Sequence, residues 1–171
     1  MRGIIAQYPM IGLRHPYYSA PHNNPEILSL PGVSIQDPTY IDDYLAKAPS
    51  VTSNAEPPAR GEFFQTSVYH GLLLKLLLRG ADDAMALKLI PEDRVKAGEK
   101  SPPIFILHGT EDILVPVGMS TNYVDLLLKA GHSKEEILLV TRPGGHGFDE
   151  TTVLSDDWLQ DGLKFVTNYW L

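Results

Sequence analysis

The chain contains no cysteine among its 171 residues. This absence excludes a disulfide framework, a thiolate metal site and a cysteine nucleophile. The longest apolar run, Leu72 to Leu78, is interrupted by Lys75 and is much shorter than the roughly 20 residues that cross a bilayer. The apolar run near the N-terminus, Ile4 to Ala6, is too brief for the core of a signal peptide. We therefore expect no transmembrane segment, no leader and a cytoplasmic location.

Positive charge is also scarce, because 14 Lys and Arg residues stand against 21 Asp and Glu residues and leave a net charge of -7. Such a chain repels phosphate backbones and anionic headgroups, so we expect neither nucleic acid nor a membrane surface as a partner. The histidines show no i, i+4 pair and no metal-ligand spacing, so no metal ion and no cofactor are expected. These histidines are His15, His22, His70, His108, His132 and His146.

Three short apolar runs predict buried strands, at Ile4–Ala6, Ile104–Leu107 and Ile137–Val140. Each of the last two runs is followed by a loop and then by an amphipathic segment that predicts a helix, Met119–Ala130 and Val153–Leu171. This order is typical of a parallel sheet with right-handed crossovers. The sequence therefore predicts an α/β fold whose short parallel sheet of three strands is flanked by helices.

The region between the first and second strands has a different composition, since prolines between Gly12 and Arg60 keep its elements short. Helices are predicted at Pro38–Ala48 with Asp37 as N-cap, at Gly61–Arg79, at Ala81–Ile90 and from Pro91 to Val95. We predict three parts: a first strand in residues 1–11, a helical insertion in residues 12–100, and a C-terminal α/β segment in residues 101–171.

Two polar residues lie in the loops that follow the last two predicted strands. Asp112 comes five residues after Leu107, and His146 comes six residues after Val140. In open parallel sheets the reactive groups sit at the carboxyl ends of the strands. Because neighbouring strands lie about 4.8 Å apart, the two side chains are expected to converge. His146 would then act as a general base, and Asp112 would hold its tautomer and stabilise the imidazolium.

The segment from Pro103 to Phe148, with HGTEDILVP and PGGHGF, resembles the C-terminal end of the α/β-hydrolase superfamily. It is most similar to the prolyl-oligopeptidase-like and dienelactone-hydrolase-like esterase branches. In those families an H-G-x-x-D motif ends the seventh strand and supplies the triad acid, and a Gly-His loop after the eighth strand supplies the base. The resemblance implies that Asp112 is the acid and His146 the base. It also implies that residues 1–11 are the sixth strand and residues 12–100 the cap.

The nucleophile of such a triad is missing, since no G-x-S-x-G occurs in the chain. That motif presents a serine on a sharp turn between a strand and a helix. In the resembling families it precedes the sixth strand, so the resemblance implies that it and the oxyanion-hole loop lie before Met1. None of the chain's own candidate serines has the strand-turn-helix context that presents a nucleophile. These candidates are Ser19, Ser29, Ser34, Ser50, Ser53, Ser67 and Ser120.

The resemblance therefore implies that the chain is the C-terminal part of a serine hydrolase. The complete enzyme would act on the ester bond, or the peptide bond, of a small-molecule substrate, and this chain would be inactive alone. A carboxylesterase is favoured over a peptidase because no propeller domain is visible. The alternative is a non-catalytic module that keeps the end of the fold as a binding or heteromeric partner. In either case the unpaired edge of the first strand, at Ile4–Ala6, predicts self-association.

Overall fold

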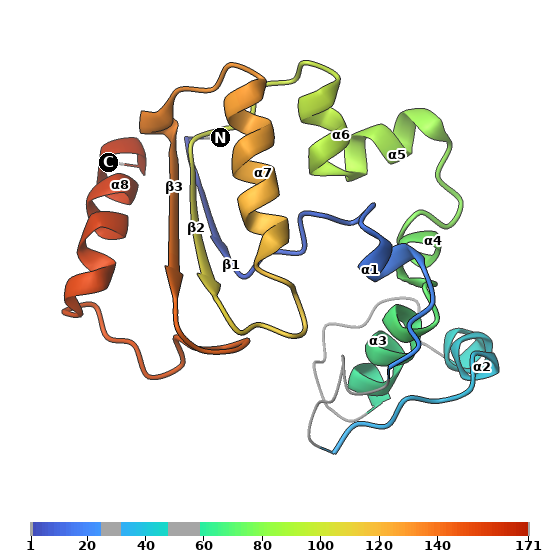
Figure 1. The fold of residues 1–171 in the computed structure, drawn as a ribbon. Helices are drawn as coiled ribbons and strands as arrows, with labels where there is room; N and C mark the ends of the chain where they lie inside the picture. Colours follow the sequence, from blue (N-terminus) through green and yellow to red (C-terminus); the bar gives the residue numbers. More distant parts are fainter. Residues whose placement is uncertain (1, 25–31, 48–58, 171) are drawn as a thin grey trace. The chain divides into compact units, whose positions relative to one another are not determined.

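In the computed structural model, residues 2–24, 32–47 and 59–170 are described (Figure 1). The chain divides into two compact units. The sheet unit comprises Met1–Gly12 and Asp82–Leu171, and the helical unit comprises Leu13–Ala81. The sequence assigned residues 12–100 to one inserted lobe, whereas the structure places residues 82–100 in the sheet unit. The physical reason is that Val95 is buried in the same hydrophobic core as Ile104 and Ile106 of the sheet.

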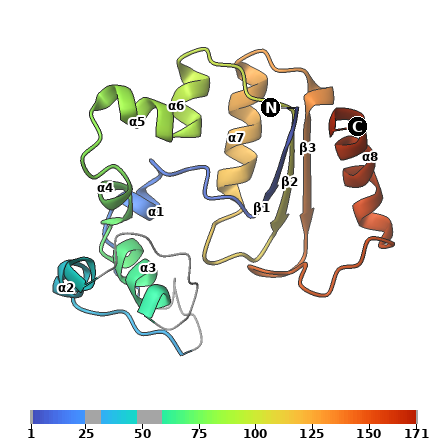
Figure 2. The same ribbon diagram turned by 180° about the vertical axis from the view of Figure 1, so that it is seen from behind.

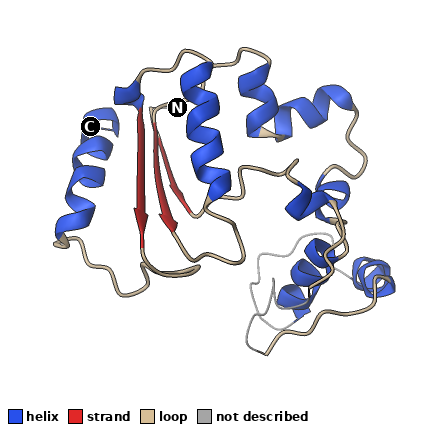
Figure 3. Cartoon of the chain, viewed as in Figure 1, coloured by secondary structure: helices blue, strands red, loops and turns tan. Residues whose placement is uncertain are grey.

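Three parallel strands form the sheet, as the sequence predicted, and the α/β fold class is confirmed (Figure 3). The strands lie in the order β1 (Ile4–Gln7), β2 (Ile104–Gly109) and β3 (Ile137–Arg142). The central strand β2 is buried along its whole length. Within the described residues β1 is an outer strand, and Ile5 is 44% exposed. Self-association along this edge stays a prediction.

Helices cover both faces of the sheet (Figure 2). The helices of the sheet unit are α5 (Asp83–Leu89), α6 (Pro91–Lys96), α7 (Gly118–Lys129) and α8 (Gln160–Trp170), with short 3-10 helices η2 (Lys134–Glu136) and η3 (Asp157–Leu159). On one face Ile106 of β2 packs in a core with Leu127 of α7. On the other face Phe105, the residue before Ile106, lies directly against Gly162 of α8. Because neighbouring side chains alternate along a strand, α7 and α8 lie on opposite faces.

The last helix begins later than the sequence predicted, at Gln160 instead of Val153. The backbone N–H of Val153 donates to the carboxylate of Asp156 at 3.2 Å, and the N–H of Asp156 donates to the carbonyl of Val153 at 3.0 Å. A side chain that bonds to nearby backbone competes with helical hydrogen bonds, and it forms a turn here instead. The predicted end of this helix, Leu171, lies outside the described residues.

The helical unit contains four helices within the described residues, α1 (Pro16–Ser19), α2 (Thr39–Lys47), α3 (Ala59–Tyr69) and α4 (Leu73–Leu77). Asp37 accepts from the backbone N–H of Thr39 at 3.0 Å, which agrees with its predicted capping position at the start of α2. The predicted last residue of that helix, Ala48, lies outside the described residues. The short helix α1 was not predicted. Within the described residues, no helix combines the length and the apolar character that a membrane span needs.

The prediction of one continuous helix from Gly61 to Arg79 is wrong, because a break separates α3 from α4. Gly71, in the break, has φ +66, a conformation that side chains other than glycine rarely adopt. A Cβ at this position would lie 2.8 Å from the Cα of Ala20. The close approach of the α1 segment therefore ends α3, and the apolar spacing of the sequence gave no sign of it.

The start of α5 offers a direct test of local helix stability. Asp82 caps this helix, since its Oδ1 accepts from the backbone N–H of Met85 at 2.7 Å. We expect Asp82→Ala to lower the free energy of unfolding by about 1 kcal/mol in urea denaturation, because it removes the only side-chain acceptor for that N–H in the described residues. Asp82→Ser keeps a capping oxygen and should retain most of the stability. Equal losses in the two variants would contradict the capping role.

Candidate active site

Asp112 lies in the loop after β2, and its side chain is fully buried. Its Oδ1 accepts from the backbone N–H groups of Leu114 and Val115, each at 2.9 Å. A carboxylate that receives two backbone hydrogen bonds from its own loop is held in one orientation. This arrangement satisfies Oδ1 within the loop and leaves Oδ2 for a partner from another part of the chain.

That partner is His146, in the loop after β3. Its Nδ1 lies 2.9 Å from Oδ2 of Asp112, and its side chain is 35% exposed. Because the carboxylate accepts, Nδ1 carries the proton and Nε2 keeps its lone pair. The structure therefore brings together the two residues that the sequence singled out, a buried carboxylate and a partly exposed imidazole. Such an imidazole can take a proton at Nε2 while the carboxylate stabilises the resulting charge.

Backbone hydrogen bonds tie the two loops to each other. The N–H of Thr110 donates to the carbonyl of Arg142 at 2.8 Å, and the N–H of Glu111 donates to the carbonyl of Gly144 at 2.9 Å. The loops pass so close at Gly109 that a Cβ there would lie 2.6 Å from the carbonyl oxygen of Gly145. The distance between Asp112 and His146 is thus set by main-chain contacts as well as by the side chains themselves.

A second histidine, His108 at the end of β2, contacts the same carboxylate and was not predicted to take part. Its Nε2 lies 2.7 Å from the carbonyl oxygen of Val115 and 3.4 Å from Oδ2 of Asp112. Its Nδ1 lies 2.7 Å from Oγ of Ser120. Since a carbonyl only accepts, Nε2 is the protonated nitrogen, and Nδ1 accepts from the serine hydroxyl.

Both members of this His108–Ser120 pair are fully buried. The sequence predicted His108 at the end of a strand and Ser120 in the first turn of the following helix. The two residues lie twelve positions apart, and no spacing rule links them. The pair supports the loop that carries Asp112 from inside, because it fixes the imidazole that lies beside both Asp112 and the carbonyl of Val115. The serine hydroxyl is engaged there and does not face solvent.

Tyr8, directly after β1, packs against His146. Its ring centroid lies 4.3 Å from that of His146, with the ring planes inclined at 56°. Tyr8 has φ 35, the one positive value outside glycine among the described residues. A bulky residue in this region is strained and persists only where surrounding contacts hold it. Here its N–H donates to the carbonyl of Leu107 at 2.7 Å, so β2 holds the strained residue beside the imidazole.

Acidic groups surround Tyr8 as well. The pKa of the Tyr8 phenol is raised, and burial is the largest cause. The charge of Asp149, a hydrogen bond to Asp149 and the charges of Glu150 and Asp112 act in the same direction. The carboxylate of Asp149 also accepts from the side-chain amide of Gln7 at 2.7 Å. The neutral phenol is therefore favoured beside the imidazole.

The raised pKa of Tyr8 predicts a stability change in alkaline solution. The folded protein holds the phenol proton more tightly than the unfolded chain does, so the free energy of unfolding should fall as the pH rises above about 10. We expect a shallower fall in Tyr8→Phe, measured by urea denaturation at a series of pH values. Burial also raises the pKa of Tyr40 and of Tyr123, which accounts for the slope that remains. Identical slopes in the two proteins would contradict the prediction.

In the part of the chain that the structure describes, no group of three or more His, Cys, Asp and Glu side chains is placed to hold a metal ion.

The chain is similar to a carboxylesterase along nearly its whole length. No protein-family model matches the chain. Over 171 residues it is 22% identical to the probable carboxylesterase M8 of Phoma sp., a match that covers 99% of this chain and 52% of that protein. A 120-residue stretch is 31% identical to part of the non-reducing polyketide synthase ausA of Penicillium brasilianum, covering 61% of this chain and 5% of the synthase.

Among solved structures, the esterase PF2001 of Pyrococcus furiosus matches with a TM-score of 0.41 and 15% identity, over 98% of this chain and 53% of that one. The chain spans about half the length of the carboxylesterase and of the esterase that it matches. From the match along nearly its whole length, we conclude that the chain is a distant homologue of carboxylesterases.

Proposed function

We propose that this chain carries the acid and the base of an ester hydrolase, with Asp112 as the acid and His146 as the general base. The observation that carries the proposal is the 2.9 Å contact between Oδ2 of Asp112 and Nδ1 of His146, made by a fully buried carboxylate. Buried carboxylates that hold a half-exposed imidazole in one tautomer are the acid and base arrangement of serine hydrolases. The relation to carboxylesterases supports an ester as the bond that is cleaved, ahead of a peptide.

The reaction assigns one role to each group. A serine hydroxyl attacks the ester carbonyl and gives its proton to Nε2 of His146, and Asp112 stabilises the imidazolium that forms. The imidazolium then protonates the departing alcohol. In the second half a water molecule gives a proton to Nε2 as it attacks the acyl carbonyl, and the imidazolium then returns a proton to the serine oxygen as the carboxylic acid leaves. Because Asp112 is buried, its attraction to the imidazolium is screened little by water.

The nucleophile of this proposal comes from residues outside the 171 of the chain. No G-x-S-x-G occurs among them, and the buried hydroxyl of Ser120 is bound to His108. The carboxylesterase relative is about twice as long as the match, which leaves room for a nucleophile and an oxyanion hole. On this proposal the chain by itself has no turnover. Of the two branches that the sequence resembles, we propose the esterase branch, in a cytoplasmic protein that acts on small-molecule esters.

The test compares the 171-residue chain with the product of the whole reading frame that encodes it. We expect the chain alone to hydrolyse no p-nitrophenyl ester and to take up no fluorophosphonate label. The product that includes the nucleophile should do both. His146→Ala and Asp112→Asn in that product should remove the hydrolysis, whereas Asp125→Asn, at an exposed position on α7, should leave it unchanged.

Two results would overturn the proposal. Labelling of the 171-residue chain that is abolished by changing one of its own serines would show that the nucleophile lies within it. A full reading frame without hydrolysis and without a nucleophile motif would instead support the alternative, a non-catalytic module that acts as a binding partner.

A further inference from the structure

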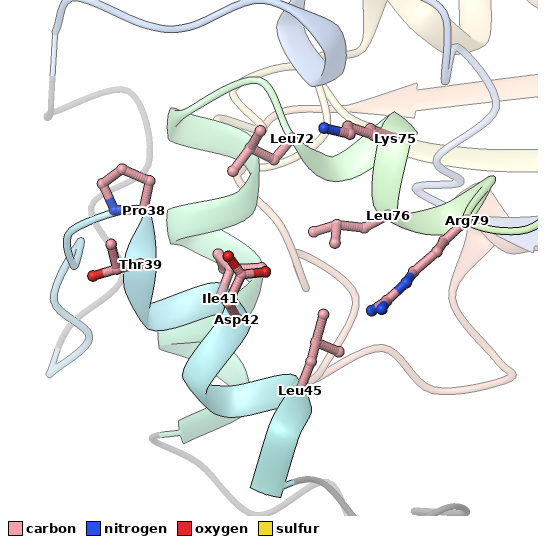
Figure 4. A pocket seen from close by; sticks show the side chains of 9 residues that line it. All are labelled: Pro38, Thr39, Ile41, Asp42, Leu45, Leu72, Lys75, Leu76 and Arg79. Atoms are coloured by element: carbon pink, nitrogen blue, oxygen red, sulfur yellow. The ribbon is translucent and has the colours of Figure 1, made fainter.

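A cavity of about 370 Å³ lies within the helical unit, between α2 and the segment of α4 (Figure 4). Its apolar lining comes from both sides, with Ile41 and Leu45 on α2 and Leu72 and Leu76 on the α4 side. Ile41 is buried, and the three leucines are partly buried. Cavities of this volume with an apolar lining are of the size that holds small organic ligands. None of these residues belongs to the acid and base site.

Two cationic side chains line this cavity. Lys75 in α4 and Arg79, two residues beyond the end of α4, both line it and are exposed. Figure 4 shows the Arg79 side chain extending toward Leu45 of the opposite helix. Within the described residues neither cation has a salt-bridge partner. Their charges are therefore available to an anion that reaches the cavity.

One carboxylate, that of Asp42, also lines the cavity. With two cations and one anion, the charges that line the cavity sum to one positive charge, which is neutralised by a ligand with a single negative charge. An anion is attracted by the two cations more strongly than it is repelled by the one carboxylate, whereas an amine would be repelled by Lys75 and Arg79. The apolar lining favours a ligand that carries a hydrocarbon part beside its charged group, because the transfer of apolar surface from water to an apolar environment is favourable.

We propose that this cavity binds an unbranched aliphatic carboxylate. The hydrocarbon tail lies between Ile41 and Leu45 of α2 and Leu72 and Leu76 of the facing segment. The carboxylate lies at the rim, between the ammonium of Lys75 and the guanidinium of Arg79. This binding does not depend on the proposed ester hydrolysis, since it uses residues of the helical unit alone.

Isothermal titration of the 171-residue chain with octanoate tests the proposal directly. We expect saturable binding, with the affinity rising about fourfold for each methylene added from hexanoate to octanoate. Octanol and octylamine should bind more weakly than octanoate, because neither offers a negative charge to the cations. Acetate, which has the charge without the tail, should show no measurable binding.

Charge variants separate the two parts of the site. Lys75→Gln and Arg79→Gln should each weaken octanoate binding by about two- to fivefold, the range of a partly exposed ion pair. Asp42→Asn should strengthen it, since a repulsive charge is removed. Lys88→Gln, at an exposed position in α5 of the sheet unit, is the matched control and should change nothing. Circular dichroism of each variant checks that the fold is kept.

Three results would overturn the proposal: no octanoate binding by the wild-type chain, equal affinities for octanoate and octanol, or unchanged affinity in the double variant of Lys75 and Arg79. The result is independent of the proposed function, because His146→Ala should bind octanoate as the wild type does. Loss of hydrolysis with retained octanoate binding, or the reverse, shows which of the two proposals has failed.

Discussion

Asp112→Ala is expected to lower the free energy of unfolding by about 3–5 kcal/mol. The buried carboxylate accepts from the N–H groups of Leu114 and Val115 and from Nδ1 of His146. Truncation to alanine leaves both backbone donors without their acceptor in a buried loop, and each orphaned group costs about 1–3 kcal/mol. It also removes the charge beside His108. The loss is therefore much larger than that of an average substitution.

Urea denaturation measures this loss of stability, and two milder variants serve as comparisons. Asp112→Asn keeps an oxygen for the two backbone N–H groups and should cost clearly less than the alanine variant. Asp125→Asn changes an exposed carboxylate on α7 and should stay within about 0.5 kcal/mol of the wild type. If Asp112→Ala were no more destabilising than Asp125→Asn, the hydrogen bonds of the acid loop would not hold it in place.

Gly109→Ala is expected to lower the free energy of unfolding by about 3 kcal/mol, which is the upper end of the usual range of losses at an overpacked site. The added Cβ would meet the carbonyl oxygens of Gly144 and Gly145, the latter at 2.6 Å. Both obstacles are backbone atoms, so no side chain can rotate away to make room. The loop that carries Asp112 and the loop that carries His146 would have to separate.

Gly118→Ala is the matched control for this prediction. Gly118 is the first residue of α7, and a Cβ there would meet nothing within 4 Å. Alanine at this position should leave the stability unchanged or raise it by up to about 1 kcal/mol, because it favours the helix. The NMR signal of the Nδ1 proton of His146 gives a second readout. It should shift or vanish in Gly109→Ala and stay in Gly118→Ala, and an unchanged signal in both would contradict the close approach of the loops.

Several features of the sheet unit follow from local patterns of the sequence. Short aliphatic runs bounded by turn residues predicted all three strands and their parallel arrangement, because burial on both faces requires such runs. The convergence of Asp112 and His146 followed from their positions just beyond two of these runs. Parallel strands that lie side by side end at the same edge, so the sequence distance from each strand end was enough to bring the two together.

Other features depended on contacts between distant segments. The break between α3 and α4 arises where Gly71 meets the backbone of Ala20, fifty-one positions earlier in the chain. The apolar spacing of Gly61–Arg79 continues across that break, so periodicity alone predicted a single helix. The late start of α8 has a local cause instead, because the side chain of Asp156 accepts from the N–H of Val153, three positions earlier, and the helical pattern of the segment did not reveal this turn.

The sequence alone therefore determined the α/β class, the parallel strands and the pair Asp112 and His146, since strand periodicity and strand-end position are local properties. Only the tertiary structure decided what surrounds the pair: the buried His108 and Ser120 beside Asp112, and the strained Tyr8 against His146. It also decided that α5 and α6 belong with the sheet. These contacts join residues far apart in the chain, and their geometry exists only after the strands have paired and the helices have packed.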